Sequence, residues 1–372
     1  MPSEIPVPFW LRRLSLLVHG VAADRERPDL IELGRIDDPE DFVWQILPHA
    51  ARTFAACIAL MPRRAALPSA VAYLYCRMLD TYEDLVPDAA ERDAALQQFG
   101  ARLSKTGHSV GSAPVISRAS DLDARDRAHL LLVERAALVD RVFLAFDEGT
   151  RAIIRDLVSD MARGMRWSSA TFARQGGVLT SDSQLSEYCG HVLGNPTVFG
   201  MRILRLCYGG RTTLTAAERR DAMSVGEFVQ LANVTRDIEK DLSRGIAYDP
   251  SLRADLGRNA RDDAPDAAFL ERCRAVREKL LRRAASLSPA YARVIDAIGL
   301  PPVSVARAAA VLMVLFTEHY YLSCAAIAGV LPPQPTASPS TLILRSLMTT
   351  FLPVAGRREL ARAENRLGQL SS

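Results

Sequence analysis

The sequence offers little that would support zinc chemistry, disulfide bonding or nucleic-acid binding. Its six cysteines are widely scattered, they form no CxxC pair, and no histidine stands at a zinc-like spacing from them. Such usage is typical of reduced, intracellular cysteines that act as small core residues. The net charge of +3 is too small to indicate a nucleic-acid partner, although nearly all of the positive charge is arginine. We therefore expect a cytoplasmic protein that does not bind nucleic acid.

The sequence also lacks a convincing signal peptide and an unbroken apolar run of membrane-spanning length. The apolar stretch near its start is short and interrupted by polar residues. The most apolar region, 303–331, contains Arg307, Glu318 and His319, whereas a membrane span needs about 20 predominantly apolar residues. This region predicts a buried helix. The arginine-rich surface would still permit peripheral association with an anionic membrane.

Alternating patterns typical of β-strands are absent, and helical periodicity dominates. Apolar residues three and four apart predict helices over 55–84, 125–146, 150–166, 183–207, 215–241, 266–286 and 303–327. The breaks between them, rich in Gly, Ser or Pro, are too short to separate domains. We predict one all-α domain over residues 1–372, with 1–45 as an N-terminal helical cap and 332–372 as a C-terminal tail and helix.

A first acidic motif lies within one of these predicted helices. Asp80 and Asp84 share a helix face with Tyr73 and Arg77, and Glu83 lies beside them. The rest of this helix is largely apolar, so it should be buried, where carboxylates repel one another unless they are compensated. Mg²⁺ is a natural compensating ion because it takes carboxylate oxygens and leaves positions open for a substrate phosphate. For this motif alone, an exposed acidic helix end is an equal alternative.

A second motif repeats the pattern later in the chain. Asn233, Asp237 and Asp241 recur every four residues, with Gln230 one turn earlier and Arg236 on the adjacent ridge. A solvated polar face would explain this stripe alone, but two such stripes on two apolar helices favour binding of metal ions and a diphosphate between them. Ions held there would act as Lewis acids on a departing diphosphate. The allylic cation left behind would need an apolar, aromatic-lined cavity that excludes water.

At these residues the sequence resembles the squalene/phytoene synthase family, over about residues 53–331. The resemblance is carried by the segments RTFAA (52–56), YLYCRMLDTYED (73–84), YC (188–189) and 230–241. The DTYED form is more similar to squalene synthases, whereas Arg244-Gly245 and Tyr248-x-Pro250 are more similar to bacterial phytoene synthases. The resemblance implies an all-α, isoprenoid synthase-type helical bundle around a central cavity.

The resemblance also implies roles for particular residues. Those implied to bind metal are Asp80, Glu83, Asp84, Asn233, Asp237 and Asp241. Those implied to contact substrate diphosphate are Arg52, Thr53, Arg77, Gln230 and Arg236. Tyr73 and Tyr188 are implied to be catalytic, near the reacting carbons, where a phenol or the bound diphosphate takes the proton released on cyclopropane closure. Packing in the core with a satisfied hydroxyl is the competing interpretation for each tyrosine.

The activity that the resemblance implies is a Mg²⁺-dependent, head-to-head condensation of two farnesyl diphosphates. The reaction passes through a cyclopropylcarbinyl (presqualene) diphosphate to squalene or a close C30 product, and NADPH supplies the hydride where squalene is formed. Phytoene synthesis from two geranylgeranyl diphosphates, and class I cyclisation of one prenyl diphosphate, are open alternatives. A non-catalytic assembly factor, a branch in which the acidic motifs have decayed, is disfavoured because both motifs are intact here.

Three features depart from the family's pattern. After Tyr188-Cys189 the family has a run of small residues, but here Pro196 predicts a kinked or broken helix, which leaves the product open. The basic loop linked to NADPH in eukaryotic squalene synthases has no clear counterpart, and residues 332–340 take its place. In place of the C-terminal membrane anchor of those enzymes, we expect a charged helix over 357–370.

Overall fold

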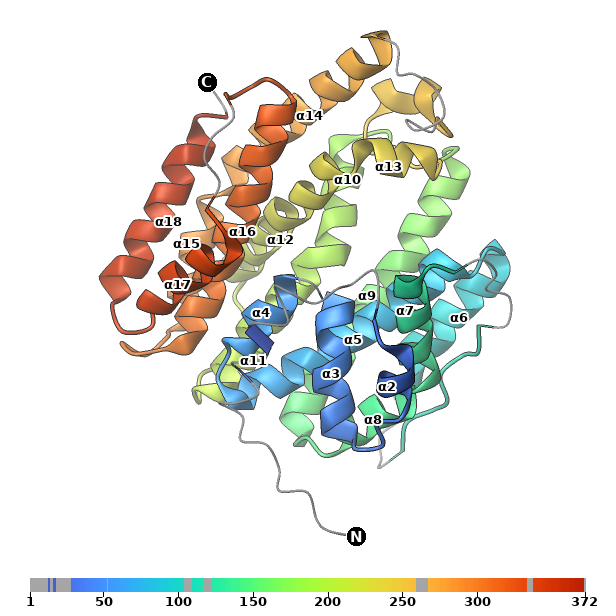
Figure 1. Cartoon of the computed structure of the whole chain (residues 1–372), viewed down its shortest axis with the longest axis vertical. Coiled ribbons are helices and arrows are strands. Elements are labelled where there is room, and N and C mark those ends of the chain that lie inside the picture. The colour runs from blue at the N-terminus through green and yellow to red at the C-terminus, as the bar shows by residue number, and fades with distance from the viewer. Residues whose placement is uncertain are drawn as a thin grey trace.

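Helices dominate the computed structural model of the chain (Figure 1). The structure describes residues 13, 16–17, 28–51, 53–103, 109–116, 122–258, 267–332 and 337–370. Across these ranges there is no strand, and the one isolated β-bridge is a parallel pairing of Val178 with Ala247. The prediction of an all-α fold is therefore confirmed.

The helices before residue 175 are α2 (Leu30–Gly34), α3 (Pro39–Ala51), α4 (Thr53–Ala59), α5 (Arg63–Leu85), α6 (Ala89–Arg102), α7 (Ala124–Glu134), α8 (Ala136–Leu144) and α9 (Glu148–Arg174). Those that follow are α10 (Asp182–Cys189), η1 (Gly190–Gly194), α11 (Asn195–Cys207), α12 (Ala216–Arg236), α13 (Ile238–Ser243), η2 (Pro250–Asp255), α14 (Ala267–Leu287), α15 (Ala290–Ile298), α16 (Val305–Ile327), α17 (Pro339–Met348) and α18 (Pro353–Gly368). Most predicted spans match. α2 and the first half of α3 fall within the predicted N-terminal helical cap, whereas α6, α15 and α17 were not predicted.

Three spans that were predicted as single helices are each divided in two. The division between α4 and α5 falls before Pro62, which is extended (φ −58°, ψ 146°). Those between α7 and α8 and between α12 and α13 fall at Arg135 (φ −100°, ψ 21°) and Asp237 (φ −100°, ψ 16°). The departures at Arg135 and Asp237 are small, and they leave the apolar periodicity nearly in phase.

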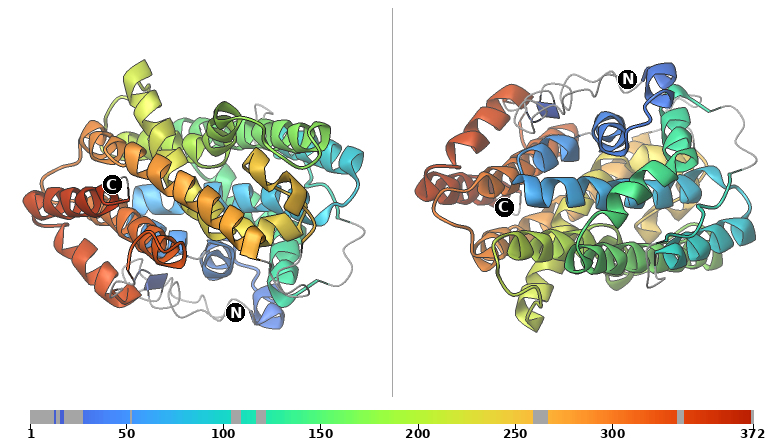
Figure 2. Two further views of the ribbon diagram at one scale, coloured as in Figure 1. Left: turned by 90° about the horizontal axis from the view of Figure 1, so that it is seen from above. Right: turned by 90° about the horizontal axis from the view of Figure 1, so that it is seen from below.

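Two helices organise the molecule. α5 packs against α3, α7 and α9 in the first half of the chain, and α12 packs against α14, α15 and α16 in the second. α11 contacts both α5 and α12, and α4 reaches across to α16. The blue-to-green helices and the orange and red helices therefore lie side by side, an arrangement seen from above and below as well (Figure 2).

The most apolar helix is α16. By length and composition it could cross a membrane, but 61% of its most apolar window is buried inside the protein. It packs against α4, α12, α17 and α18, and its buried Tyr321 hydroxyl donates a hydrogen bond to the Phe228 carbonyl of α12. The prediction of a buried helix in this region is confirmed.

The helix that follows Tyr188 is not broken at Pro196. The chain stays helical from Asp182 to Cys207, because Gly190–Gly194 widen into a π-helical turn in which the Asn195 N–H bonds to the Gly190 carbonyl. Pro196 thus falls in the first turn of α11, where a missing N–H is tolerated. A local change of helix type replaces the predicted break.

Candidate active site

α5 presents the first acidic motif on its half-buried face, near its C-terminal end. Its opposite side is packed in the core, where Met78 and Leu79 are fully buried. On the motif side, Arg77 Nη2 donates a hydrogen bond to the Tyr73 hydroxyl at 3.1 Å, and Arg77 Nη1 lies 3.1 Å from Asp80 Oδ2. The first part of the predicted stripe, from Tyr73 through Arg77 to Asp80, is thus a continuous chain of polar contacts along one face of the helix.

Asp80 and Glu83 lie where their charges are poorly compensated. Burial raises the pKa of Asp80 to about 6, with Arg77 opposing the shift and Asp84 adding to it. Burial, reinforced by Asp80 and Asp84, raises the pKa of Glu83 to about 8. From α9, the Ser168 and Ser169 hydroxyls donate long hydrogen bonds to Glu83 Oε1, at 3.5 and 3.4 Å. Burial therefore keeps these two carboxyls protonated to a higher pH than ordinary carboxyls.

The second motif spans the joint between α12 and α13. The Asp237 and Asp241 N–H groups bond to the carbonyls of Asn233 and Asp237, at 2.9 and 2.8 Å, so the four-residue repeat continues through the joint. Asn233 Nδ2 donates to Oε1 of the buried Gln230 at 3.1 Å. One uninterrupted helix was the wrong prediction, but the stripe itself is present.

The carboxylates of the second motif point in different directions. Arg236 donates to both Asp237 oxygens, at 2.8 and 2.6 Å. Burial, with Asp237 adding to it, raises the pKa of Asp241 to about 7. Glu239, by contrast, accepts two hydrogen bonds from Arg277 of α14, at 2.8 and 2.7 Å. Glu239 therefore fastens α13 to α14 and is not part of the stripe.

The two motifs face one another. Arg244, just after the second motif, places Nη1 3.9 Å from Asp84 Oδ1 of the first. The pKa of the Tyr188 phenol is raised by burial and, in addition, by Glu83 of the first motif and Asp241 of the second. The Tyr188 phenol therefore lies near carboxylates of both motifs.

Tyr188 belongs to an aromatic cluster beside the carboxylates. Its hydroxyl lies 3.3 Å from that of Tyr248, and their ring centroids are 5.2 Å apart. Phe172 of α9 stands edge-on to both rings, with centroids 6.2 and 5.9 Å away. The cluster gives an acidic site an aromatic wall, the combination that ionising a prenyl diphosphate needs.

The other predicted residues gather around Tyr73. Its ring lies 5.6 Å from that of Phe54, and its hydroxyl is 3.5 Å from the Ala50 carbonyl. Thr53 begins α4 beside Phe54 and is half-buried. Arg52 lies outside the described residues. The structure therefore brings Tyr73, Arg77 and Asp80 into one contact chain, while Thr53 stands at the far end of it.

Several residues at the site were not predicted. Ser168, Ser169 and Phe172 come from α9, and no sequence pattern connects this helix to either motif. Tyr248 appeared only within a family-like pattern, with no role given to it.

The donor set fits Mg²⁺ bound together with a diphosphate. All six residues implied as ligands offer oxygen atoms, which hard cations prefer. Within the ranges that the structure describes, no three His, Cys, Asp or Glu side chains form a cluster that could hold one ion. Mg²⁺ in proteins usually keeps several waters and uses one or two carboxylates plus substrate phosphates. Two facing stripes match that mode of binding.

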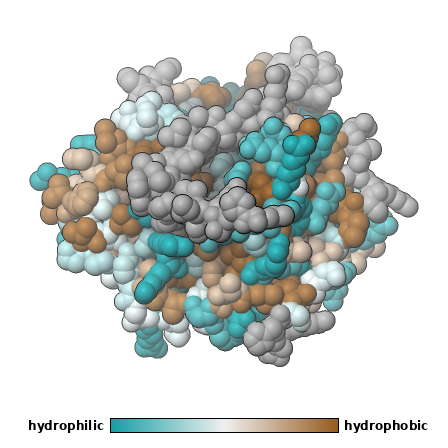
Figure 3. All heavy atoms as spheres, turned by 60° about the horizontal axis from the view of Figure 1, so that its bottom comes forward, coloured by the Kyte–Doolittle hydropathy of each residue, from teal (hydrophilic) through white to brown (hydrophobic). Residues whose placement is uncertain are grey.

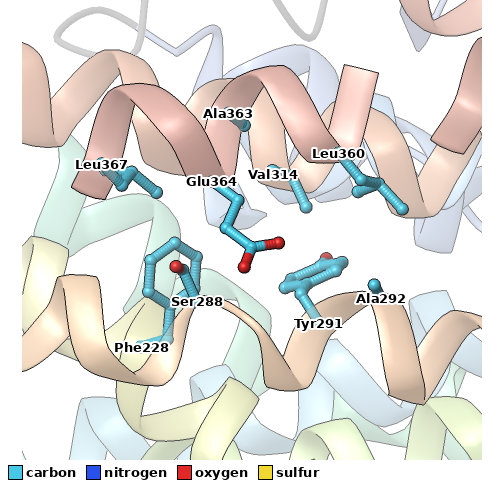
Figure 4. Close-up of a pocket in the computed structure, with 9 residues that line it drawn as sticks. All are labelled: Phe228, Ser288, Tyr291, Ala292, Val314, Leu360, Ala363, Glu364 and Leu367. Carbon is cyan, nitrogen blue, oxygen red and sulfur yellow. The ribbon is translucent and has the colours of Figure 1, made fainter. Parts of the chain in front are cut away.

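A separate pocket lies away from these motifs (Figure 4). It lies between α12, α15, α16 and α18, has room for little more than a water molecule, and its lining is mostly apolar. Figure 4 shows the Glu364 carboxylate projecting between Phe228 and Tyr291. No residue of either acidic motif lines this pocket, so it is not part of the candidate active site.

Comparisons with known proteins agree with this geometry. Lycopaoctaene synthase of Botryococcus braunii is 31% identical over 212 residues, which cover 56% of this chain and 43% of that protein. Squalene synthase clz20 of Cochliobolus lunatus is 26% identical over 247 residues, covering 64% and 52%. The chain thus matches about half the length of these curated relatives. The solved complex of TcSQS with the ligand BPH1237 shares the fold, with a TM-score of 0.68, 17% identity and coverage of 89% of this chain and 92% of that one.

The family comparison covers both motifs. The squalene/phytoene synthase model matches residues 47–320, which include Tyr73, Tyr188 and the carboxylates of both acidic motifs. That match spans well over half of the chain, and the chain belongs to the squalene/phytoene synthase family.

Proposed function

We propose that this protein is a Mg²⁺-dependent prenyl transferase that condenses two farnesyl diphosphates head to head. The product is squalene or a close C30 compound, formed through presqualene diphosphate. The observation that carries the proposal is the pair of acidic motifs facing each other beside Tyr188, with Arg244 of one side close to Asp84 of the other. Similarity to squalene synthases supports the reaction class.

Each side of the site has a distinct role in this proposal. The metal ligands are Asp80, Glu83 and Asp84 on one side and Asn233, Asp237 and Asp241 on the other. Bound Mg²⁺ would supply the Lewis acidity that helps the diphosphate to leave. Arg77 and Arg236 are paired with Asp80 and Asp237, and both would be available to contact the diphosphate if bound metal ions neutralised those carboxylates.

The tyrosines act as neutral groups. The pKa values of Tyr188 and Tyr248 are both raised, chiefly by burial, so both phenols stay protonated at neutral pH. A neutral phenol is a very poor base, and the released diphosphate is the better acceptor for the proton lost on cyclopropane closure. The rings of Tyr188, Tyr248 and Phe172 instead stabilise the allylic cation through their faces and exclude water.

A second candidate is the coupling of two geranylgeranyl diphosphates. The Arg244-Gly245 and Tyr248-x-Pro250 pattern favours it, since it is more similar to phytoene synthases. Lycopaoctaene synthase, which is named for a different product, is also more similar in sequence than the squalene synthase above (31% against 26% identity).

Product analysis separates the candidates. Purified protein would be incubated with Mg²⁺ and either farnesyl or geranylgeranyl diphosphate, with and without NADPH, and the extracted lipids analysed by mass spectrometry. We expect a C30 product from farnesyl diphosphate, with NADPH deciding between squalene and its presqualene or dehydrosqualene relatives. A C40 product alone would establish the second candidate, and a cyclic C15 product would indicate a cyclase. Consumption of neither substrate would refute both.

We expect Mg²⁺ to bind more tightly as the pH rises from about 6 to about 8. The pKa values of Asp80 (about 6), Asp241 (about 7) and Glu83 (about 8) are raised, so these carboxyls keep their protons at pH values where ordinary carboxyls have lost them. Metal ions must displace those protons. Titration calorimetry with Mg²⁺ and inorganic pyrophosphate at pH 7, in buffers of different ionisation enthalpy, should show proton release. Glu83→Gln should reduce it, and binding without proton release would contradict the prediction.

Tyr188→Phe should keep turnover within about tenfold of the wild type. The ring that faces the cation remains, and only a neutral hydrogen bond worth about 1 kcal/mol is lost. A general base in this position would cost roughly a hundredfold or more. Steady-state kinetics decides between these outcomes. Tyr291→Phe, which removes a buried hydroxyl far from the motifs, is the matched control and should leave turnover unchanged.

A further inference from the structure

Exposed apolar side chains concentrate at the corner between α17 and α18. Half of the large hydrophobic residues that are exposed in the described chain lie within 344–354. We name as the corner patch Leu344, Met348, Phe351, Leu352 and Val354, whose exposed fractions are 63, 57, 70, 54 and 61%. In Figure 3, hydrophobic surface gathers at the left edge, the side on which α17 and α18 lie in Figure 1. Clustered apolar surface of this kind marks an interaction site.

The corner patch stands on a tightly fastened base. The buried Arg307 of α16 donates hydrogen bonds to the carbonyls of Pro301, Pro302 and Thr349, at 2.8, 2.9 and 3.3 Å. The Ser304 N–H bonds to the Thr350 carbonyl at 3.0 Å.

α18 begins close against the same arginine. A Cβ added at Gly356 would lie 3.0 Å from Arg307 Cδ, so this glycine permits the close approach. These contacts also bring Val303, which is 59% exposed, next to the patch. Hydrogen bonds therefore fix the backbone beneath the corner patch, so its apolar side chains are exposed on a well-ordered part of the structure.

Positive charge borders the corner patch. Arg357 and Arg358 follow it directly on α18 and are exposed, and Arg357 lies 4.0 Å from its carboxylate neighbour Asp296. The one acidic residue in the adjoining turn, Glu359, is already paired with Arg345 and Arg362. An apolar corner bordered by arginine fits an anionic lipid surface, where cations near the headgroups strengthen binding.

We propose that this corner docks on an anionic lipid bilayer. Phe351 and Leu352 enter the boundary between headgroups and acyl chains, while Arg357 and Arg358 contact lipid phosphates. A second copy of the chain is a poorer occupant, because a two-fold contact through this patch would bring the same arginines of both copies together. The inference rests on this surface alone and does not require the proposed function. If that function holds, docking would place an apolar product next to the membrane that can dissolve it.

Vesicle flotation with the full chain tests the proposal. Vesicles of phosphatidylcholine alone would be compared with vesicles that also contain phosphatidylglycerol. We expect binding to the anionic vesicles, weakened by more than about tenfold in the double variant Phe351→Ser/Leu352→Ser. Arg357→Glu/Arg358→Glu should lose the preference for anionic lipid. Val115→Ser, which removes an apolar side chain that is 88% exposed elsewhere, should bind as the wild type does.

Other outcomes would overturn the proposal. These are absence of vesicle binding by the wild type, or unchanged binding by both double variants. Light scattering could also show that the wild type is a dimer and that Phe351→Ser/Leu352→Ser is a monomer. If vesicle binding were unchanged in that variant, the patch would be a self-association surface. Thermal unfolding by circular dichroism checks that the variants fold. Turnover of detergent-dispersed substrate should be unchanged in the corner variants, so failure of catalysis and failure of docking are told apart.

Discussion

Asp241→Asn and Asp80→Asn should each lower turnover by about a thousandfold or more. Each substitution replaces a negatively charged metal ligand with a neutral amide and so weakens metal binding on one side of the site. The electrostatic stabilisation that metal ions give a departing anion is worth several kcal/mol. Burial raises the pKa of both carboxyls, which means that the folded protein disfavours their ionised form. In the metal-free protein, a neutral asparagine should therefore be at least as stable at these positions as an ionised aspartate. The metal-free variants should therefore be as stable as the wild type at pH 8, or more so. Kinetics at saturating Mg²⁺ and urea unfolding test the two effects separately.

Glu239→Gln is the matched control, since it makes the same chemical change within the same motif. Glu239 faces Arg277 and not the stripe, so turnover should stay within a few-fold of the wild type. Stability should instead fall by roughly 1–3 kcal/mol, because Arg277 is buried (6% exposed) whereas Glu239 is 32% exposed and partly screened. If Glu239→Gln lost turnover as Asp241→Asn does, our assignment of which carboxylates face the site would be wrong.

Helical periodicity predicted the parts of the site that lie along one helix. Tyr73, Arg77 and Asp80 are joined by side-chain contacts because residues three and four apart meet on a helix surface. The same rule gave the second stripe, even though the helix divides at Asp237. Two hydrogen bonds, from the Asp237 N–H to the Asn233 carbonyl and from the Asp241 N–H to the Asp237 carbonyl, span that joint, so the division has almost no signature in the apolar pattern.

What the sequence could not predict depends on contacts between distant helices. Glu239 is off the stripe by its spacing, but only the fold reveals that its partner is Arg277. The approach of α9, which brings Ser168 and Phe172 to the site, has no sequence signal at either motif. Pro196 was expected to kink or break its helix, but the chain stays helical there, with a π-helical turn just before the proline. That turn is possible here because glycines on two helices let the backbones touch.

The backbones of η1 and α12 touch at Gly226. Gly226→Ala should therefore destabilise the protein by about 3 kcal/mol or more and also lower turnover. A Cβ at Gly226 would lie 2.2 Å from the Gly194 nitrogen, 2.3 Å from the Gly194 Cα and 2.4 Å from the Leu193 carbonyl carbon. All three are backbone atoms, so no rotamer change relieves the overlap, and the cost should reach or exceed the upper end of ordinary overpacking. α12 would have to shift away from η1, and it carries Gln230 and Asn233 of the second motif.

Gly200→Ala provides the comparison in the neighbouring helix. A Cβ at Gly200 would meet nothing within 4 Å, and alanine is favoured over glycine inside a helix by about 1 kcal/mol. This variant should therefore be slightly more stable than the wild type and equally active. Urea unfolding and steady-state kinetics on both variants test the contact. Equal unfolding midpoints for Gly226→Ala and the wild type would mean that η1 and α12 are not in backbone contact, and that the π-helical turn does not help to set the position of the second acidic motif.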